Sequence, residues 1–240
     1  MTKRKIKRWP NIRGEWPPQS ILARIPASIL DQWLNAGEVR EFRANEVLLH
    51  EGAKDSSVIL ILSGCVKVVT RIGDDEVLLA VRVGGDLVGE FAALDHGVRS
   101  ATVVACGRPP VLTCSISDHD FNSALDGQQG EVAREITASI VAKLRSATRR
   151  RADLAKDSHA RLASLVVDLA DDYGHPLSGK AFLIKVNLTQ GELGALIGVS
   201  EATAHRAIRR LKDRRLVEVS GRRLIAKDLD ALRAIASTTK

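Results

Sequence analysis

Short apolar segments separated by turn residues dominate the chain between residues 38 and 116. β-Branched residues are frequent in these segments, and glycine, aspartate and serine fill the gaps between them. Many short strands at regular spacing are typical of an all-β sandwich or barrel, and no segment between them is long enough for the helix of a parallel βαβ unit. The predicted strands cover residues 47–49, 58–62, 66–69, 77–83, 101–105 and 111–113.

The segment before the strands has two parts. Residues 1–18 have no apolar period and carry six basic residues against one acidic residue, so we predict a flexible basic arm there. Helical spacing then begins at Pro26 and ends at Gly37.

A helical period replaces the strand pattern from about residue 130. Apolar residues recur at intervals of mostly three or four and form one stripe on a helix of about 25 residues. Such a helix is either a core helix packed on its own sheet or half of a dimer seam. We favour the seam, because the small domain behind it cannot cover the whole stripe. The stripe consists of Val132, Ile136, Ile140, Leu144, Ala147 and Leu154, and another helix is predicted over 160–171.

The C-terminal third contains a predicted helix-turn-helix. Thr189 and Glu192 have the spacing of a capping box at the start of a helix. After a glycine turn, Ser200 caps a second helix that runs to about Arg214. Two short strands, predicted over 216–219 and 222–225, add a wing.

The second of these helices has the residues of a DNA-reading helix. An arginine in its first turns can bind guanine through two hydrogen bonds, and a glutamate can accept one from cytosine. Helix pairs also occur without DNA, but the capping box, glycine turn, wing and positive charge together favour DNA binding. Base contacts are predicted for Ser200, Glu201, Ala202, His205 and Arg206, and phosphate contacts for Arg209 and Arg210. Arg222 and Arg223 on the wing are predicted to contact phosphates or a minor groove.

Charge is unevenly distributed along the chain. The 240 residues carry a net charge of +7, and their 45% apolar content suffices for a folded core. Residues 19–127 contain 9 basic and 15 acidic residues, whereas residues 145–223 contain 16 basic and 9 acidic residues. This asymmetry favours a C-terminal domain that binds a polyanion, although a solvated basic face would give the same total.

Several classes of protein are disfavoured. No run approaches the roughly 18 apolar residues of a membrane span, and no secretory signal follows the basic N-terminus. Cys65, Cys106 and Cys114 are odd in number and lack C-x-x-C spacing, which argues against a disulfide framework or a zinc site. We therefore expect a cytoplasmic protein. No nucleophile–base pair, metal-ligand cluster or NTPase phosphate loop is recognisable, so we expect no enzymatic activity.

Residues 84–102 have the composition of an anion site. Gly89 and Glu90 are predicted to open a helical turn whose free N–H groups can cradle an anion. Arg99 can pair with the charge of that anion, Ser100 can donate a hydroxyl, and Glu90 can accept from a sugar hydroxyl. An ordinary glycine-rich turn with a salt bridge is the alternative that these residues leave open.

This segment, G-E-x-A-x-L followed by G-x-R-S-A-T, resembles the phosphate-binding cassette of cyclic-nucleotide-binding domains. Together with the helix-turn-helix, it makes residues 20–225 similar to the CRP/FNR superfamily of transcription regulators. The resemblance implies an α+β fold: a jelly-roll-like β-roll that binds a cyclic nucleotide, a long dimerisation helix and a winged helix-turn-helix. The implied divisions are a basic arm (1–18), a sensor domain (19–127), the dimerisation helix with its hinge (128–158) and a DNA-binding domain (159–240).

The resemblance also implies a function and its residues. The protein would be a homodimer whose affinity for operator DNA is controlled by cyclic AMP, or alternatively cyclic GMP, and which acts with RNA polymerase. A different effector, or none, is the second hypothesis. The family's roles fall on Gly89, Arg99 and Ser100 (cyclic phosphate), Glu90 (ribose), Ala147 and Thr148 (purine, across the dimer), Thr189 and Gln190 (DNA phosphate), and Ser200, Glu201, Ala202 and Arg206 (bases).

Some positions depart from the family pattern. Ala147 stands where cyclic-AMP-responsive members usually have a hydroxyl, which weakens purine recognition by the helix. Glu201 and Ala202 stand where the best-known members have Arg-Glu, so a different operator is expected. Residues 1–37 contain no cysteine, which argues against the iron–sulfur branch, whereas a haem sensor stays open through His50, His96 or His119.

Overall fold

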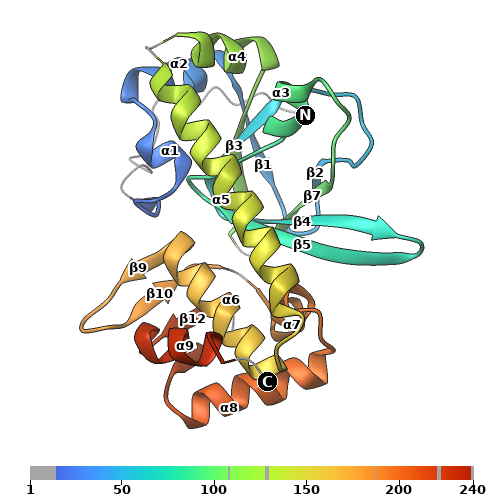
Figure 1. The fold of residues 1–240 in the computed structure, drawn as a ribbon. Helices are drawn as coiled ribbons and strands as arrows, with labels where there is room; N and C mark the ends of the chain where they lie inside the picture. Colours follow the sequence, from blue (N-terminus) through green and yellow to red (C-terminus); the bar gives the residue numbers. More distant parts are fainter. Residues whose placement is uncertain (1–14, 108, 128–129, 187, 221–222, 239–240) are drawn as a thin grey trace. The chain divides into compact units, whose positions relative to one another are not determined.

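The computed structural model describes residues 15–107, 109–127, 130–186, 188–220 and 223–238 (Figure 1). The chain forms two compact units, Met1–Ile140 and Val141–Lys240, and the long helix α5 (Glu131–Asp153) runs from the first into the second. This architecture of a strand-rich unit, a long helix and a unit with a helix-turn-helix confirms the predicted fold class.

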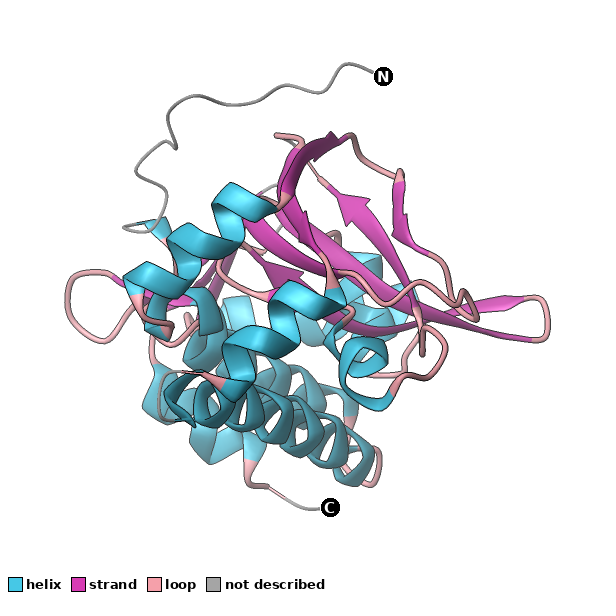
Figure 2. Ribbon diagram, turned by 90° about the horizontal axis from the view of Figure 1, so that it is seen from above, coloured by secondary structure: helices cyan, strands magenta, loops and turns pink. Residues whose placement is uncertain are grey.

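The first unit is built on two antiparallel sheets of four strands each, with strand orders β1-β8-β3-β6 and β2-β7-β4-β5. Strands are magenta and helices cyan in Figure 2. Strands at the predicted spacing therefore form the predicted sandwich. Its elements are α1 (Ile21–Arg24), α2 (Ala27–Ala36), β1 (Glu38–Phe42), β2 (Val47–Leu49), β3 (Val58–Ser63), β4 (Cys65–Ile72), β5 (Asp75–Val83), β6 (Leu87–Val88), α3 (Glu90–Asp95), β7 (Thr102–Cys106), β8 (Val111–Ile116) and α4 (Asp118–Asp126).

Strand β3 divides the core of this unit in two. Successive side chains of a strand point to opposite faces, and both faces of β3 are covered. Ile59 and Ile61 belong to one buried cluster with residues of the second sheet. Leu60 and Leu62 belong to another cluster with residues of the helices α2, α4 and α5. This double burial explains why β3 is one continuous apolar run rather than an alternating one.

The beginning of α5 packs inside the first unit and corrects our interpretation of the apolar stripe. Val132 and Ile136 are buried in the same cluster as Trp33, and Ile140 packs against its edge. The core-helix alternative is therefore right for this half, because the helix covers its own sheet. Leu144 is 65% exposed and belongs to the second unit.

The end of the predicted basic arm is also part of this core. Trp16 is buried, and its Nε1 donates a hydrogen bond to the Leu62 carbonyl at 2.8 Å. The prediction of a flexible arm up to residue 18 is thus wrong at Trp16, because a buried indole fixes the backbone there. Residues 1–14 of the predicted arm lie outside the described residues.

All three cysteines are buried, and none of them forms a disulfide bond. Cys65 and Cys106 are direct partners on β4 and β7, and their sulfur atoms lie 3.0 Å apart. Burial raises the pKa of the Cys114 thiol to about 12, which keeps it protonated and unreactive.

The second unit contains the predicted helix-turn-helix and wing. Thr189 Oγ1 accepts from the Glu192 N–H at 3.1 Å, and Glu192 Oε2 accepts from the Thr189 N–H at 2.8 Å, so both halves of the capping box are present. Ser200 caps the following helix through the Thr203 N–H. The elements are α6 (Ser158–Tyr173), β9 (Gly174–Pro176), β10 (Phe182–Ile184), α7 (Gln190–Leu196), α8 (Glu201–Asp213), β11 (Val217–Ser220), β12 (Arg223–Ala226) and α9 (Leu229–Ala236).

Candidate nucleotide and DNA sites

The turn between β6 and α3 depends on the absence of a side chain at Gly89. Its φ of +87° lies in the left-handed region, which glycine adopts at little cost. A Cβ at this position would lie 2.5 Å from Arg99 Nη1 and 2.9 Å from the Ser57 carbonyl oxygen. Glycine therefore allows both the turn and the close approach of the guanidinium group of Arg99.

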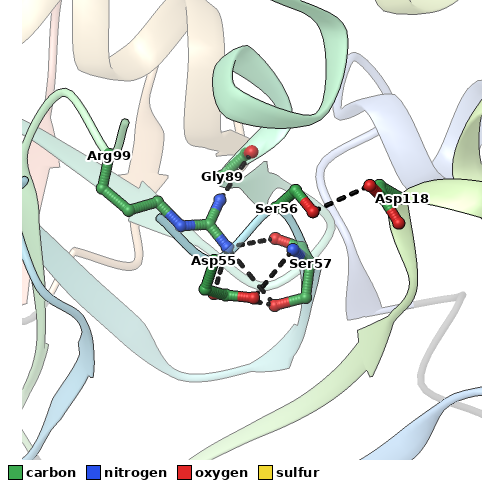
Figure 3. Close-up of polar contacts among 6 residues, drawn as sticks. All are labelled: Asp55, Ser56, Ser57, Gly89, Arg99 and Asp118. Carbon is green, nitrogen blue, oxygen red and sulfur yellow. Dashed lines mark hydrogen bonds and ion pairs between the residues drawn. The ribbon is translucent and has the colours of Figure 1, made fainter. Parts of the chain in front are cut away.

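Arg99 is the central charged group of this site (Figure 3). Its side chain is only 2% exposed. Nη1 donates to the Gly89 carbonyl at 2.8 Å, and Nη2 donates to the Ser57 carbonyl at 2.6 Å and to Ser57 Oγ at 3.3 Å. Among the described residues, the buried Nε finds no acceptor.

Asp55 forms an ion pair with the same guanidinium group, through Arg99 Nη2 (Figure 3). The Asp55 carboxylate also accepts hydrogen bonds from the Ser57 N–H at 3.0 Å and from Ser57 Oγ at 3.1 Å. Burial by itself would raise the pKa of the Asp55 carboxyl, but the bonds from Arg99 and Ser57 outweigh it and hold the pKa below its usual value. The carboxyl is therefore ionised at neutral pH.

The loop that carries Asp55 and Ser57 is fixed to Arg99 through the backbone as well. The Arg99 N–H donates to the Ala53 carbonyl at 2.9 Å, and the Gly52 N–H donates to the Arg99 carbonyl at 2.8 Å. Sequence reasoning missed Asp55 and Ser57, because the loop precedes Arg99 by more than 40 residues. An Asp-Ser-Ser turn before a buried strand was the only signal.

The other predicted nucleotide residues fall into two groups. Glu90 is buried at the start of α3, directly after Gly89, whereas Ser100 is exposed beside Arg99. The structure thus brings Arg99 to Gly89, with Glu90 and Ser100 as their next neighbours in the chain. Ala147 and Thr148 are exposed on the part of α5 that belongs to the second unit.

Helix α8 presents an outer face of polar and charged residues. Ala204, Ala207, Ile208 and Leu211 are buried, so the residues between them face outward. Arg206 Nη2 donates to Thr203 Oγ1 at 3.0 Å, and Glu201 Oε1 lies 3.5 Å from His205 Nε2. All the residues predicted to contact DNA from this helix and its N-cap are exposed: Ser200, Glu201, Ala202, His205, Arg206, Arg209 and Arg210.

The first turn of α7 lies beside the beginning of α8. A Cβ at Gly191 would meet the Glu201 carboxylate at 3.4–3.6 Å. Thr189 is exposed and Gln190 half-buried at this same end of α7. The structure therefore places Thr189 and Gln190, which were predicted to contact DNA phosphate, near Glu201. Glu201 also contacts His205, so it has partners within the protein.

The wing consists of β11 and β12, which pair antiparallel with Ser220 opposite Arg223. Arg223 is exposed at the end of β12 that leads from the turn. Arg222, the other predicted wing contact, lies outside the described residues.

Arg161, at the start of α6, connects the end of α5 to the helix-turn-helix. Its Nη2 donates to the Leu154 carbonyl at 2.7 Å, and its Nε donates to the Lys156 carbonyl at 2.9 Å. Its Nη1 donates to the Ile197 carbonyl, at the end of α7, at 3.2 Å. One guanidinium group thus satisfies carbonyls at two helix ends, a role that the sequence analysis did not assign.

The described residues contain neither a candidate membrane span nor a candidate metal site. No helix among them is long and apolar enough to cross a membrane. No group of three or more histidine, cysteine, aspartate or glutamate side chains among them could hold a metal ion.

Two family models match the chain. A cyclic nucleotide-binding domain matches residues 39–128, which include Arg99 and its acceptors. A Crp-like helix-turn-helix domain matches residues 160–235, which include α7, α8 and the wing. The two models together account for most of the described chain and occur in the order of the two units.

Curated relatives match across both units. A cAMP-activated global transcriptional regulator CRP from Pasteurella multocida is 24% identical over 202 residues, covering 82% of this chain and 93% of the relative. A CRP-like cAMP-activated global transcriptional regulator from Mycobacterium tuberculosis is 25% identical over 194 residues, covering 80% of this chain and 85% of the relative.

Solved structures with the same fold include FixK2 from Bradyrhizobium japonicum, with a TM-score of 0.70 at 18% identity, covering 85% of this chain and 99% of that one. The c-di-GMP responsive global regulator CLP of Xanthomonas campestris has a TM-score of 0.64 at 20% identity, covering 84% and 99%. At these identities the likeness establishes the fold.

Proposed function

We propose that this chain, which belongs to the CRP/FNR family of transcription regulators, acts as a homodimer whose affinity for operator DNA is set by a cyclic nucleotide. The family is one of regulators rather than enzymes. The nucleotide-binding and helix-turn-helix domains both match, so a nucleotide effector and DNA are its ligand classes. The effector, the dimer and the individual contacts are our proposal.

The observation that carries the nucleotide site is the buried guanidinium group of Arg99. Asp55, Ser57 and Gly89 accept from its terminal nitrogens, whereas its Nε has no acceptor among the described residues. A buried cation at the surface of a loop that already tolerates one exposed carboxylate is suited to an anionic ligand. Gly89 lets the guanidinium group lie against the backbone at the start of α3, and Ser100 is exposed next to Arg99 in the chain. We assign the cyclic phosphate to Gly89, Arg99 and Ser100, and the ribose hydroxyl to Glu90.

Cyclic AMP is the effector that we propose first, because the curated relatives are named as cAMP-activated. Cyclic GMP has the same ribose and cyclic phosphate, so the contacts of Glu90 and Arg99 do not separate the two. Purine recognition falls to Ala147 and Thr148, of which only Thr148 has a hydroxyl. A different effector is the alternative, since one regulator of the same fold is described as c-di-GMP responsive.

The exposed apolar residues of α5 support a homodimer. Val141 and Leu144 are three residues apart, which puts them on the same side of the helix, and both are exposed in the single chain. Thr137 and Thr148 continue this spacing and are also exposed. These four positions have the a/d spacing of a two-helix seam, with apolar side chains at the two central positions.

Arg206 and Arg223 are proposed to play different parts in DNA binding. Arg206→Ala should reduce the free energy of binding to the preferred operator by about 1–3 kcal/mol, because an arginine on a recognition helix can bind a base edge. The variant should also be less selective at one base pair per half-site. Arg223→Ala should weaken all sequences nearly equally and lower the salt dependence by about one counterion per subunit. Selection of operators from random DNA with each variant measures both effects. The assignment fails if the Arg223 variant alters the selected motif and the Arg206 variant leaves it unchanged.

Nucleotide can control DNA binding only by favouring one of two arrangements of the dimer. Arg161 supports such control, because it bonds carbonyls at the end of α5 and at the end of α7. A change at α5 is thereby transmitted to the helix-turn-helix through a few hydrogen bonds. Thermodynamic linkage then requires operator DNA to raise the nucleotide affinity by the same factor as nucleotide raises the DNA affinity.

Calorimetry tests this function directly. The purified protein is titrated with cyclic AMP and with cyclic GMP, alone and bound to an operator obtained by selection. We expect cyclic AMP to bind, and to bind about 5–150-fold more tightly in the presence of operator. Identical nucleotide affinities with and without DNA would reject the coupling. Absence of binding by both nucleotides would reject a cyclic-nucleotide effector.

A further inference from the structure

We propose that Asp55 is an internal competitor of the nucleotide phosphate, whose carboxylate occupies Arg99 and thereby raises the nucleotide concentration at which the protein responds. This inference rests on the proposed function of the site and adds a determinant of its affinity. Asp55 lies outside the segment 84–102 that carries the family motif.

The Asp55 carboxylate lies directly against the guanidinium group of Arg99. Among the described residues, the one ion pair of Arg99 is with Asp55, and it engages Nη2 directly. A phosphate bound to the same guanidinium group would face this negative charge at very short range. Two like charges that share one cation repel each other, so one of them has to give way.

A phosphate can displace the Asp55 side chain from the site, but it cannot displace Arg99. The Asp55 side chain is 53% exposed, whereas that of Arg99 is 2% exposed. A carboxylate at the surface regains water when it rotates away, so its displacement costs far less than that of a buried ion. Asp55 therefore reduces the affinity for phosphate without blocking the site.

Other groups of the protein hold Arg99 in its orientation when Asp55 is removed. The Gly89 carbonyl, the Ser57 carbonyl and Ser57 Oγ accept from its two terminal nitrogens. Its backbone pairs with Gly52 and Ala53. If Asp55 instead served to position Arg99, its removal would weaken nucleotide binding, so the sign of the effect separates the two roles.

Asp55→Asn tests the inference, because asparagine keeps the size of the side chain and its bond to the Ser57 N–H but removes the charge. We expect the variant to bind cyclic AMP about five- to tenfold more tightly in calorimetry, which is the effect of one like charge at about 4 Å in a solvated site. A higher salt concentration should reduce the difference in cyclic AMP affinity between the wild type and the Asp55→Asn variant.

Asp118→Asn is the matched control. Asp118 accepts a hydrogen bond from Ser56 Oγ at 2.8 Å, on the same loop as Asp55, and it forms no contact with Arg99 in Figure 3. The Asp118→Asn substitution removes one negative charge near the same loop. It should change the affinity for cyclic AMP less than about twofold, because charges that do not share a partner are screened by solvent. Thermal unfolding of both variants checks that the fold is retained.

Each outcome is decisive. Tighter binding by Asp55→Asn, with Asp118→Asn near the wild type, supports the inference, as does binding by Asp55→Asn where the wild type binds too weakly to measure. Equal or weaker binding by Asp55→Asn overturns it and leaves the proposed function intact. Equal tightening by both variants also overturns it, since the effect would then come from general charge. Failure of all three proteins to bind cyclic AMP or cyclic GMP overturns the proposed function together with the inference.

Discussion

Replacement of Arg99 by leucine is expected to weaken cyclic AMP binding by about 2–5 kcal/mol, the usual effect of removing one partner of a buried charge pair. Leucine offers the phosphate no hydrogen bond and no charge. The Gly89 and Ser57 carbonyls also lose their donors, at about 1–3 kcal/mol for each group left unsatisfied. We therefore expect a lower melting temperature in a protein that still folds.

Calorimetry of nucleotide binding and thermal unfolding should be measured together for this variant. Arg99→Lys is the control, because it retains the positive charge and loses the paired nitrogens. Its affinity should lie between those of the wild type and the leucine variant. Unchanged affinity in a folded Arg99→Leu protein would place the nucleotide elsewhere.

The second large effect separates the two halves of α5. Ile136→Asp places a carboxylate in a site that is 2% exposed, beside Trp33, and is expected to destabilise the first unit by about 3–5 kcal/mol. Leu144→Asp places the same group where the side chain is 65% exposed, so the fold of the single chain should survive. In the proposed dimer, however, this aspartate would face its own copy across the seam.

Thermal unfolding and light scattering distinguish these results. We expect a large fall in melting temperature for Ile136→Asp and a folded monomer for Leu144→Asp. Leu144→Met, which keeps an apolar side chain of similar volume, should remain a dimer. A Leu144→Asp protein that stays fully dimeric would show that the subunits associate through another surface.

Local signals in the sequence predicted much of the fold. Capping boxes, glycine turns and short β-branched segments act within a few residues, which is why the caps at Thr189 and Ser200 were predicted at the correct positions. The short elements α1, β9 and β10 have three or four residues each, too few to show a period.

Long-range contacts were the part that the sequence did not predict. The apolar stripe of α5 shows which face of the helix avoids water, but a period contains no information about what covers that face. Trp33 and its neighbours cover the first half, which only the folded chain reveals. The same holds at the nucleotide site, where Arg99 and Gly89 come from one motif but Asp55 comes from the loop before β3, four strands earlier in the chain than Gly89.

The continuity of α5 constrains how regulators of this kind can be recombined. Val132 and Ile136 complete the core of the first unit, although the change in composition suggests a boundary near residue 127. At its other end, Arg149 pairs with Asp168 of α6 at 3.1 Å, and Leu154 bonds to Arg161. A gene fusion that joins this sensor to another DNA-binding unit therefore has to cross over within α5, near Ile140, so that Val132 and Ile136 stay with the first unit. The exchangeable modules of this chain meet inside a helix and not in a linker.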